Sequence, residues 1–148
     1  MLADNKLIQR KITLINRDLK NLEKIDRIPL AKYLKNDAYE ALAERYLERI
    51  IGRLLDINYH ILTETENYSP LDYYDSFIAM GKRRYLPVDL SMSLASAAGL
   101  RNRLAHEYDE IDERKIYRSV SRCLKEVPQY LRFIIKFLNK ISKQRELL

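Results

Sequence analysis

Apolar residues recur along most of this chain at spacings of three and four, which is the period of one face of an α-helix. The pattern predicts a first helix over residues 4–26 and a long second helix over 37–65, whose apolar stripe is wide enough to contact more than one neighbour. Further helices are expected at about 69–80, 88–104 and 113–143. With almost no strand signal, these stretches predict an all-α fold, an up-and-down bundle of about four to five helices.

Polar residues, small residues and prolines mark where the helices should begin, bend, end or approach one another. Pro128 should kink or interrupt the last helix because proline removes a backbone donor, and Gly81 can end the third. Two sets of small residues would let another helix pack closely, in this subunit or in a second one. They are Gly52 in the second helix, and Ala95, Ala97, Ala98 and Gly99 in the fourth. The expected N-caps are Asp4 or Asn5, Asn36 or Asp37, Ser69 followed by Pro70, and Asp112.

Composition narrows the class of protein. The chain has 148 residues, a net charge of +6 and no repeat or second domain, so we expect one helical domain over residues 1–148 with its core at about 5–140. The positive charge favours an anionic partner. A single cysteine, Cys123, excludes an internal disulfide, and its apolar surroundings predict a buried structural thiol. No apolar run is long enough to span a membrane and no signal-peptide core is seen, so a cytoplasmic protein is expected.

The chemistry concentrates in the stretch Leu100–Tyr108. Arg101 can hold a phosphate through two parallel N–H bonds, and His106 can transfer protons near neutral pH. On a helix, Asn102 and His106 would share one face because they are four residues apart. Tyr108 stays near them on either a helical or an extended path. An arginine and a histidine beside one phosphodiester are most of what metal-free RNA cleavage needs.

Other polar residues are weaker candidates. Lys82, Arg83 and Arg84 could grip an RNA backbone, or could equally form a basic solvated turn, and Arg103 is a further possible RNA contact. His60 has no acid or base near it in sequence, which favours a packing or surface role. Two histidines and one cysteine make no convincing zinc site, so no metal ligand is assigned.

The motif carries a family resemblance. Arg101-Asn102, three residues, His106, one residue and Tyr108 resemble the Arg-x4-His-x-Tyr motif of the HEPN superfamily, in its HepT branch. The similarity covers roughly residues 5 to 140. It also includes Tyr68 to Phe77, Leu86-Pro87, Gly99-Leu100 and Ile111-Asp112.

The resemblance implies a helical bundle that acts as a metal-independent endoribonuclease toxin without a cofactor. His106 would be the general base or acid, Arg101 would stabilise charge on the phosphate, and Asn102 would orient His106 or a phosphate oxygen. It also implies a homodimer and an MntA-like nucleotidyltransferase antitoxin, which would transfer AMP to Tyr108. The substrate would be RNA, either tRNA or mRNA.

Two alternatives stay open at this point. One is a non-catalytic nucleotide- or RNA-binding helical subunit that partners a nucleotidyltransferase. The other is a helical scaffold with no nucleic-acid role, which would show a positive surface unrelated to the 101–108 motif.

Overall fold

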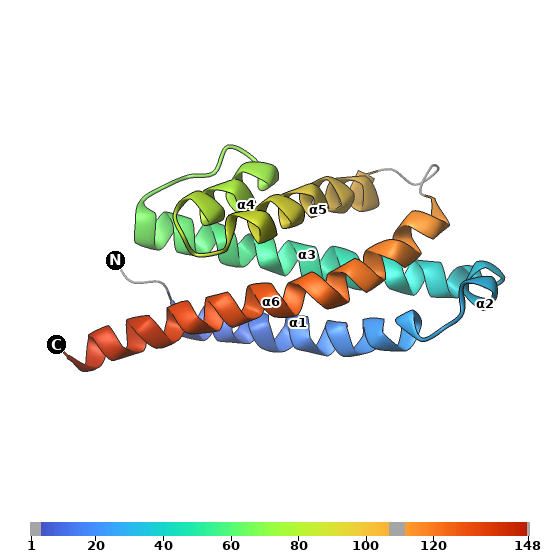
Figure 1. Cartoon of the computed structure of the whole chain (residues 1–148), viewed down its shortest axis with the longest axis horizontal. Coiled ribbons are helices and arrows are strands. Elements are labelled where there is room, and N and C mark those ends of the chain that lie inside the picture. The colour runs from blue at the N-terminus through green and yellow to red at the C-terminus, as the bar shows by residue number, and fades with distance from the viewer. Residues whose placement is uncertain (1–3, 107–111, 148) are drawn as a thin grey trace.

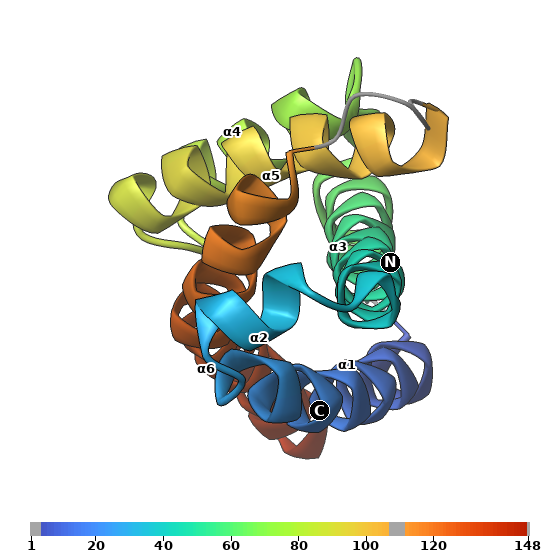
Figure 2. The ribbon, with the colours of Figure 1, turned by 90° about the vertical axis from the view of Figure 1, so that its right-hand side faces the viewer.

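Six helices make up the described part of this computed structural model, which covers the backbone of residues 4–106 and 112–147 and the side chains of 4–100 and 112–147. Three long helices, α1, α3 and α6, run side by side, and α4 and α5 form a layer over α3 (Figure 1). The short α2 lies at one end of the bundle (Figure 2). The helices are α1 (Asn5–Asp26), α2 (Leu30–Leu34), α3 (Asp37–Glu66), α4 (Tyr73–Lys82), α5 (Val88–His106) and α6 (Glu113–Glu146).

The core lies where the apolar stripes of these helices meet, which confirms the predicted bundle. Its largest fully buried side chains include Ile8 and Ile15 of α1, Leu47 and Ile57 of α3, and Tyr130 of α6. The apolar face of α6 continues past Pro128, which lies inside the helix. None of the helices in the described ranges is apolar and long enough to cross a membrane.

Side-chain caps fix the starts of the long helices as expected. Asp4 and Asn36 accept backbone N–H bonds in the first turns of α1 and α3, and Asp112 accepts one from Arg114 at 2.9 Å. At its other end α6 continues to Glu146, three residues beyond the predicted boundary at residue 143. The position of Asp112 matters most, because it sets where α6 begins after the 101–108 motif.

The predicted start of the third helix is wrong. Asp72 caps α4, accepting from the Asp75 N–H at 2.7 Å, so Ser69 lies before the helix rather than at its cap. The reason is the side chain of Asp75, whose carboxylate also accepts bonds from the Leu71 N–H and the Tyr68 hydroxyl. These bonds fold residues 68–71 over the start of α4 as a loop.

Gly81 has a different role from the one predicted. Gly81 lies inside α4 rather than after it, and a Cβ there would collide with the Ser91 side chain, so this glycine lets α5 approach α4 closely. Ala95 and Ala98 are buried within this chain. A Cβ at Gly52 would meet nothing within 4 Å, so Gly52 does not serve a close helix approach inside the subunit.

The short helix α2 is not predicted by periodicity, because five residues are too few to show a stripe. It begins after Pro29, whose carbonyl accepts the N–H groups of Lys32 and Tyr33. Tyr33 is buried and donates its hydroxyl to the Glu113 carbonyl at 3.2 Å. The Tyr33 hydrogen bond therefore connects α2 to the beginning of α6, which is the helix that follows the motif.

Three carboxylates gather at this same end of the bundle. Oxygens of Asp37, Glu40 and Glu113 lie within 4.8 Å of one another. Desolvation by burial, and then the negative charges of Glu44, Glu113 and Asp37, raise the pKa of Glu40 from 4.5 to about 7. A raised pKa means that the folded protein holds the proton more tightly than the unfolded chain. Ionisation of Glu40 therefore lowers stability as pH rises from about 4.5 to about 7.

We expect Glu40→Gln to stabilise the protein at pH 8 and to have no effect below about pH 4.5. Glu40 is partly solvated, so the gain should be near ~1 kcal/mol, or about 3 °C in Tm for a chain of this length. Thermal melts followed by circular dichroism at both pH values measure it. Glu23→Gln, an exposed carboxylate on α1, is the control. An equal gain at both pH values would contradict the assigned titration.

Candidate active site

The last turns of α5 carry the motif. Arg101, Asn102, Arg103 and His106 all lie within this helix, so positions 102 and 106 share one face of it, as the spacing predicts. Tyr108 falls outside the described residues. The helical placement confirms only the backbone part of the prediction, and the roles of these residues remain proposals.

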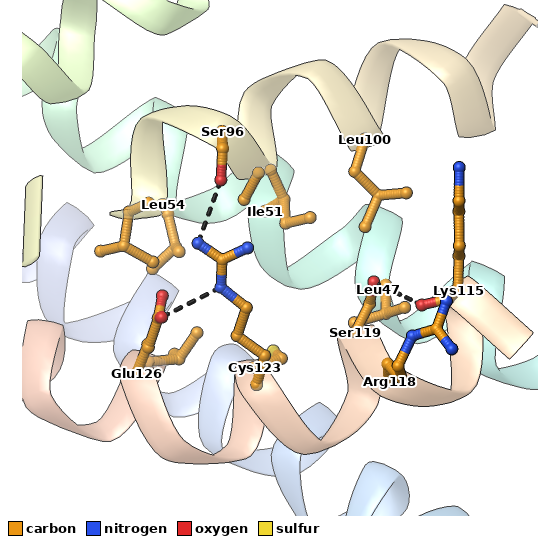
Figure 3. Close-up of a pocket in the computed structure, with 14 residues that line it drawn as sticks. Leu47, Ile51, Leu54, Ser96, Leu100, Lys115, Arg118, Ser119, Cys123 and Glu126 are labelled. Atoms are coloured by element: carbon orange, nitrogen blue, oxygen red, sulfur yellow. Dashed lines mark hydrogen bonds and ion pairs between the residues drawn. The ribbon is translucent and has the colours of Figure 1, made fainter. Parts of the chain in front are cut away.

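A cavity of about 360 Å³ lies between α3, α5 and α6, directly beside the motif (Figure 3). Leu100, which precedes Arg101, forms part of its wall. The buried side chains Leu47, Ile51 and Leu54 of α3 form its apolar side. The first turns of α6 add Lys115 to its edge. The cavity is thus bordered by the residues just before the motif and by those just after it.

Arg122 joins the two helices that flank the cavity. Its guanidinium donates to the Ser93 carbonyl at 2.8 Å and to the Ser96 hydroxyl at 3.1 Å, both on α5. On its own helix it pairs with Glu126, at 3.0 Å between Nε and Oε1. Its charge and its donors are therefore used within the protein, and it holds α6 against α5.

Two further cations stand at the edge of the cavity. Lys115 and Arg118 are exposed and line it, and the charged group of neither side chain forms a hydrogen bond or an ion pair with any residue in the described ranges. Sequence reasoning missed them. The available signal was their spacing: positions 115, 118 and 122 differ by three and four, which places three cations on one face of α6.

The predicted basic cluster lies elsewhere. Lys82, Arg83 and Arg84 come before the first residue of α5, Val88, whereas the motif begins at Arg101, about 20 Å further along the axis of this helix (Figure 1). Arg83 stacks over the ring of Tyr68, with its guanidinium carbon 4.0 Å from the ring centroid. Lys82 and Arg84 are exposed. The structure therefore does not bring this cluster together with the motif.

The remaining singled-out residues have packing roles. His60 accepts the Asp4 N–H at Nε2, with a separation of 2.8 Å, so it holds the start of α1. Cys123 is buried in the cavity wall, and burial, with a smaller contribution from Glu126, raises the pKa of its thiol to about 12. Such a thiol stays protonated at neutral pH and is a poor nucleophile. Both observations confirm the predicted structural roles.

One group of acidic side chains in the described ranges has the spacing to bind a cation. It consists of the Asp37, Glu40 and Glu113 carboxylates described above. That the reaction needs no metal remains a prediction.

Solved structures with the same fold include toxin–antitoxin complexes. One, a toxin–antitoxin with AMP-PNP, has a TM-score of 0.82 at 23% identity and covers 89% of this chain and 99% of the other. Another, a tri-AMPylated Shewanella oneidensis HEPN toxin in complex with MNT antitoxin, has a TM-score of 0.82 at 23% identity, with coverage of 90% and 99%. At this identity the comparison establishes the fold.

Sequence comparison identifies the family. The chain is 34% identical over 140 residues to the tRNA nuclease HepT of Aphanizomenon flos-aquae (strain 2012/KM1/D3), covering 95% of each chain. The family model for ribonuclease HepT-like proteins matches residues 15–134, which include the motif. The chain therefore belongs to the HepT-like ribonuclease family, as the Arg-x4-His-x-Tyr resemblance predicted.

Proposed function

We propose that this protein is a metal-independent endoribonuclease toxin of a toxin–antitoxin pair, with tRNA as its substrate class. The observation that carries the proposal is the position of Arg101, Asn102 and His106 on the last turns of α5, beside a cavity with cations at its edge. The 34% identity to a tRNA nuclease over 95% of the chain supports this substrate class.

The chemistry needs few groups. His106 takes the proton of a ribose 2′-OH, whose oxygen attacks the adjacent phosphorus while the bond to the 5′-oxygen breaks. A second imidazole gives a proton to that leaving oxygen. Arg101 stabilises the charge that develops on the non-bridging oxygens, and Asn102 orients His106 or the phosphate. The products are a 2′,3′-cyclic phosphate and a free 5′-OH.

The two proton transfers motivate a homodimer, because each motif supplies a single histidine. A twofold axis would place two copies of the motif in one cleft. Gly99 is compatible with this arrangement, since it is exposed and a Cβ there would meet nothing within 4 Å. We expect a dimeric mass by light scattering at micromolar concentration. A strictly monomeric protein that still cleaves RNA would contradict it.

The activity is tested with the purified chain and total tRNA in the presence of EDTA. We expect discrete cuts whose 5′ fragments end in a cyclic phosphate, because histidine and arginine supply the proton transfers and the charge stabilisation. The ends are identified by phosphatase resistance before and after acid treatment. Cleavage that appears only with added magnesium would exclude the mechanism. Binding of tRNA without any cleavage would favour the non-catalytic alternative.

A further inference from the structure

The cavity between α3, α5 and α6 has two kinds of lining. Its inner side is apolar, formed by Leu47, Ile51 and Leu54 of α3 with Leu100 of α5, whereas its α6 edge carries cations. Its volume of about 360 Å³ lies within the range of about 300–1,000 Å³ that is typical of small-molecule sites. An apolar surface beside cations suits a ligand with a flat base at one end and a phosphate at the other.

Three cations line the cavity. One of them is bonded to other residues of the protein, and the charged groups of the other two are not bonded to any described residue. Arg122 is bonded to Ser93, Ser96 and Glu126, so its charge is balanced inside the protein. Lys115 and Arg118 make no such bonds within the described residues and face solvent at the edge. They are one helical turn apart, so one phosphate group can lie between them.

The cavity lies near the motif along α5 but on another face of this helix. Leu100 in its wall directly precedes Arg101, while Lys115 and Arg118 lie on the first turns of α6. Successive residues of a helix differ in direction by about 100°, so positions 102 and 106 lie on the face of α5 opposite to Ser96, Ala97 and Leu100, which line the cavity. The cavity is therefore suited to a nucleotide outside the catalytic motif. The Lys82–Arg84 cluster does not line it.

We propose that this cavity binds one nucleotide outside the catalytic motif, with its base against Ile51 and Leu100 and its phosphate between Lys115 and Arg118. The assignment to RNA rests on the proposed nuclease function. The proposed ligand of the cavity is a nucleoside monophosphate unit. This unit is either part of RNA or the adenylyl group attached to Tyr108.

Binding is tested on the whole protein with methyl-labelled isoleucine and leucine, using AMP and UMP as probes. Both should shift the methyl resonances of Ile51 and Leu100, and adenosine, which lacks the phosphate, should bind more weakly. Ile141, buried in the last turns of α6, should not respond. The Lys115→Ala/Arg118→Ala protein should lose the response to AMP and UMP.

A matched control variant distinguishes binding in the cavity from non-specific electrostatic attraction between the basic protein and RNA. Arg132→Ala/Lys136→Ala removes the same two charges from exposed positions of the same helix that do not line the cavity. In tRNA cleavage, the cavity variant should raise KM about tenfold with a smaller change in kcat, while the matched variant changes KM less than about twofold. An equal increase in KM in both variants would contradict the proposed nucleotide site.

The outcomes also separate the pocket from the nuclease proposal. If tRNA is cleaved but neither mononucleotide shifts Ile51 or Leu100, the pocket is wrong and the nuclease stands. If mononucleotides bind but no preparation cleaves RNA, the pocket stands and its assignment to an RNA substrate is wrong. Protein adenylylated beforehand distinguishes the two sources: loss of the AMP response assigns the cavity to the attached adenylyl group, and a retained response assigns it to RNA.

Discussion

Replacing His106 by alanine is expected to abolish RNA cleavage and, with it, inhibition of cell growth. The imidazole is the group in the motif that can exchange protons near neutral pH, and removing a general acid or base costs a factor of about a hundred or more. In a dimer both copies are lost, so the acid and the base disappear together. Initial rates on total tRNA measure the loss, and circular dichroism should show an unchanged helical content.

The chain provides its own control for this variant. His60→Ala removes the other histidine, which accepts a backbone N–H from Asp4 far from the motif, and should leave the cleavage rate unchanged. Arg101→Ala should match His106→Ala, because it removes charge stabilisation on the phosphate. Arg10→Ala, at an exposed position of α1, should not. Normal cutting by the His106→Ala protein would disprove the mechanism.

AMP transfer to Tyr108 is expected to inactivate the toxin. Incubation with an MntA-like nucleotidyltransferase and ATP-magnesium should add AMP mass to the peptide that contains Tyr108. The added phosphates would compete for Arg101 and the adenine would fill space that an RNA base must enter. Modified protein should therefore lose RNA cleavage and toxicity. Mass spectrometry before and after the incubation decides the site.

The other tyrosines make this test selective. Tyr74 is 55% exposed and is the strongest competitor, so Tyr74→Phe should still be modified, whereas Tyr108→Phe should not. Tyr85 is a poorer acceptor, because its hydroxyl already donates to Glu66 at 2.7 Å, and burial raises its pKa. AMP found on Tyr73, Tyr74 or Tyr85 instead of Tyr108 would contradict the proposal.

The bundle could be predicted from the sequence because its helices are long and each has one apolar face. A stripe such as that of α1 requires only local spacing, and a cap such as Asp112 acts within one turn of its own helix. The start of α4 could not be predicted in this way. It depends on Asp75, which accepts a bond from Tyr68 seven residues earlier and so favours a loop over a first helical turn.

The candidate site could also be predicted from the sequence only in part. The motif is contiguous and was recognised in the sequence, and α5 carries its first six residues as expected. The cavity is formed by α3, α5 and α6, so residues as distant as Leu47 and Lys115 become neighbours only on folding. The residue types alone do not predict this proximity, because a buried leucine and an exposed lysine are ordinary residues of amphipathic helices.

The position of α6 has a consequence for biosynthesis. This helix is translated after the other five, yet it packs against both α1 and α3 and provides one wall of the cavity. A nascent chain that ends at the motif has its Arg101 and His106 but lacks the helix that buries α1 and completes the pocket. Ribosomes add about 5–20 residues per second, so the 34 residues of α6 delay completion of the site by a few seconds. We therefore expect a chain that ends before α6 to be inactive, because it lacks this wall of the cavity.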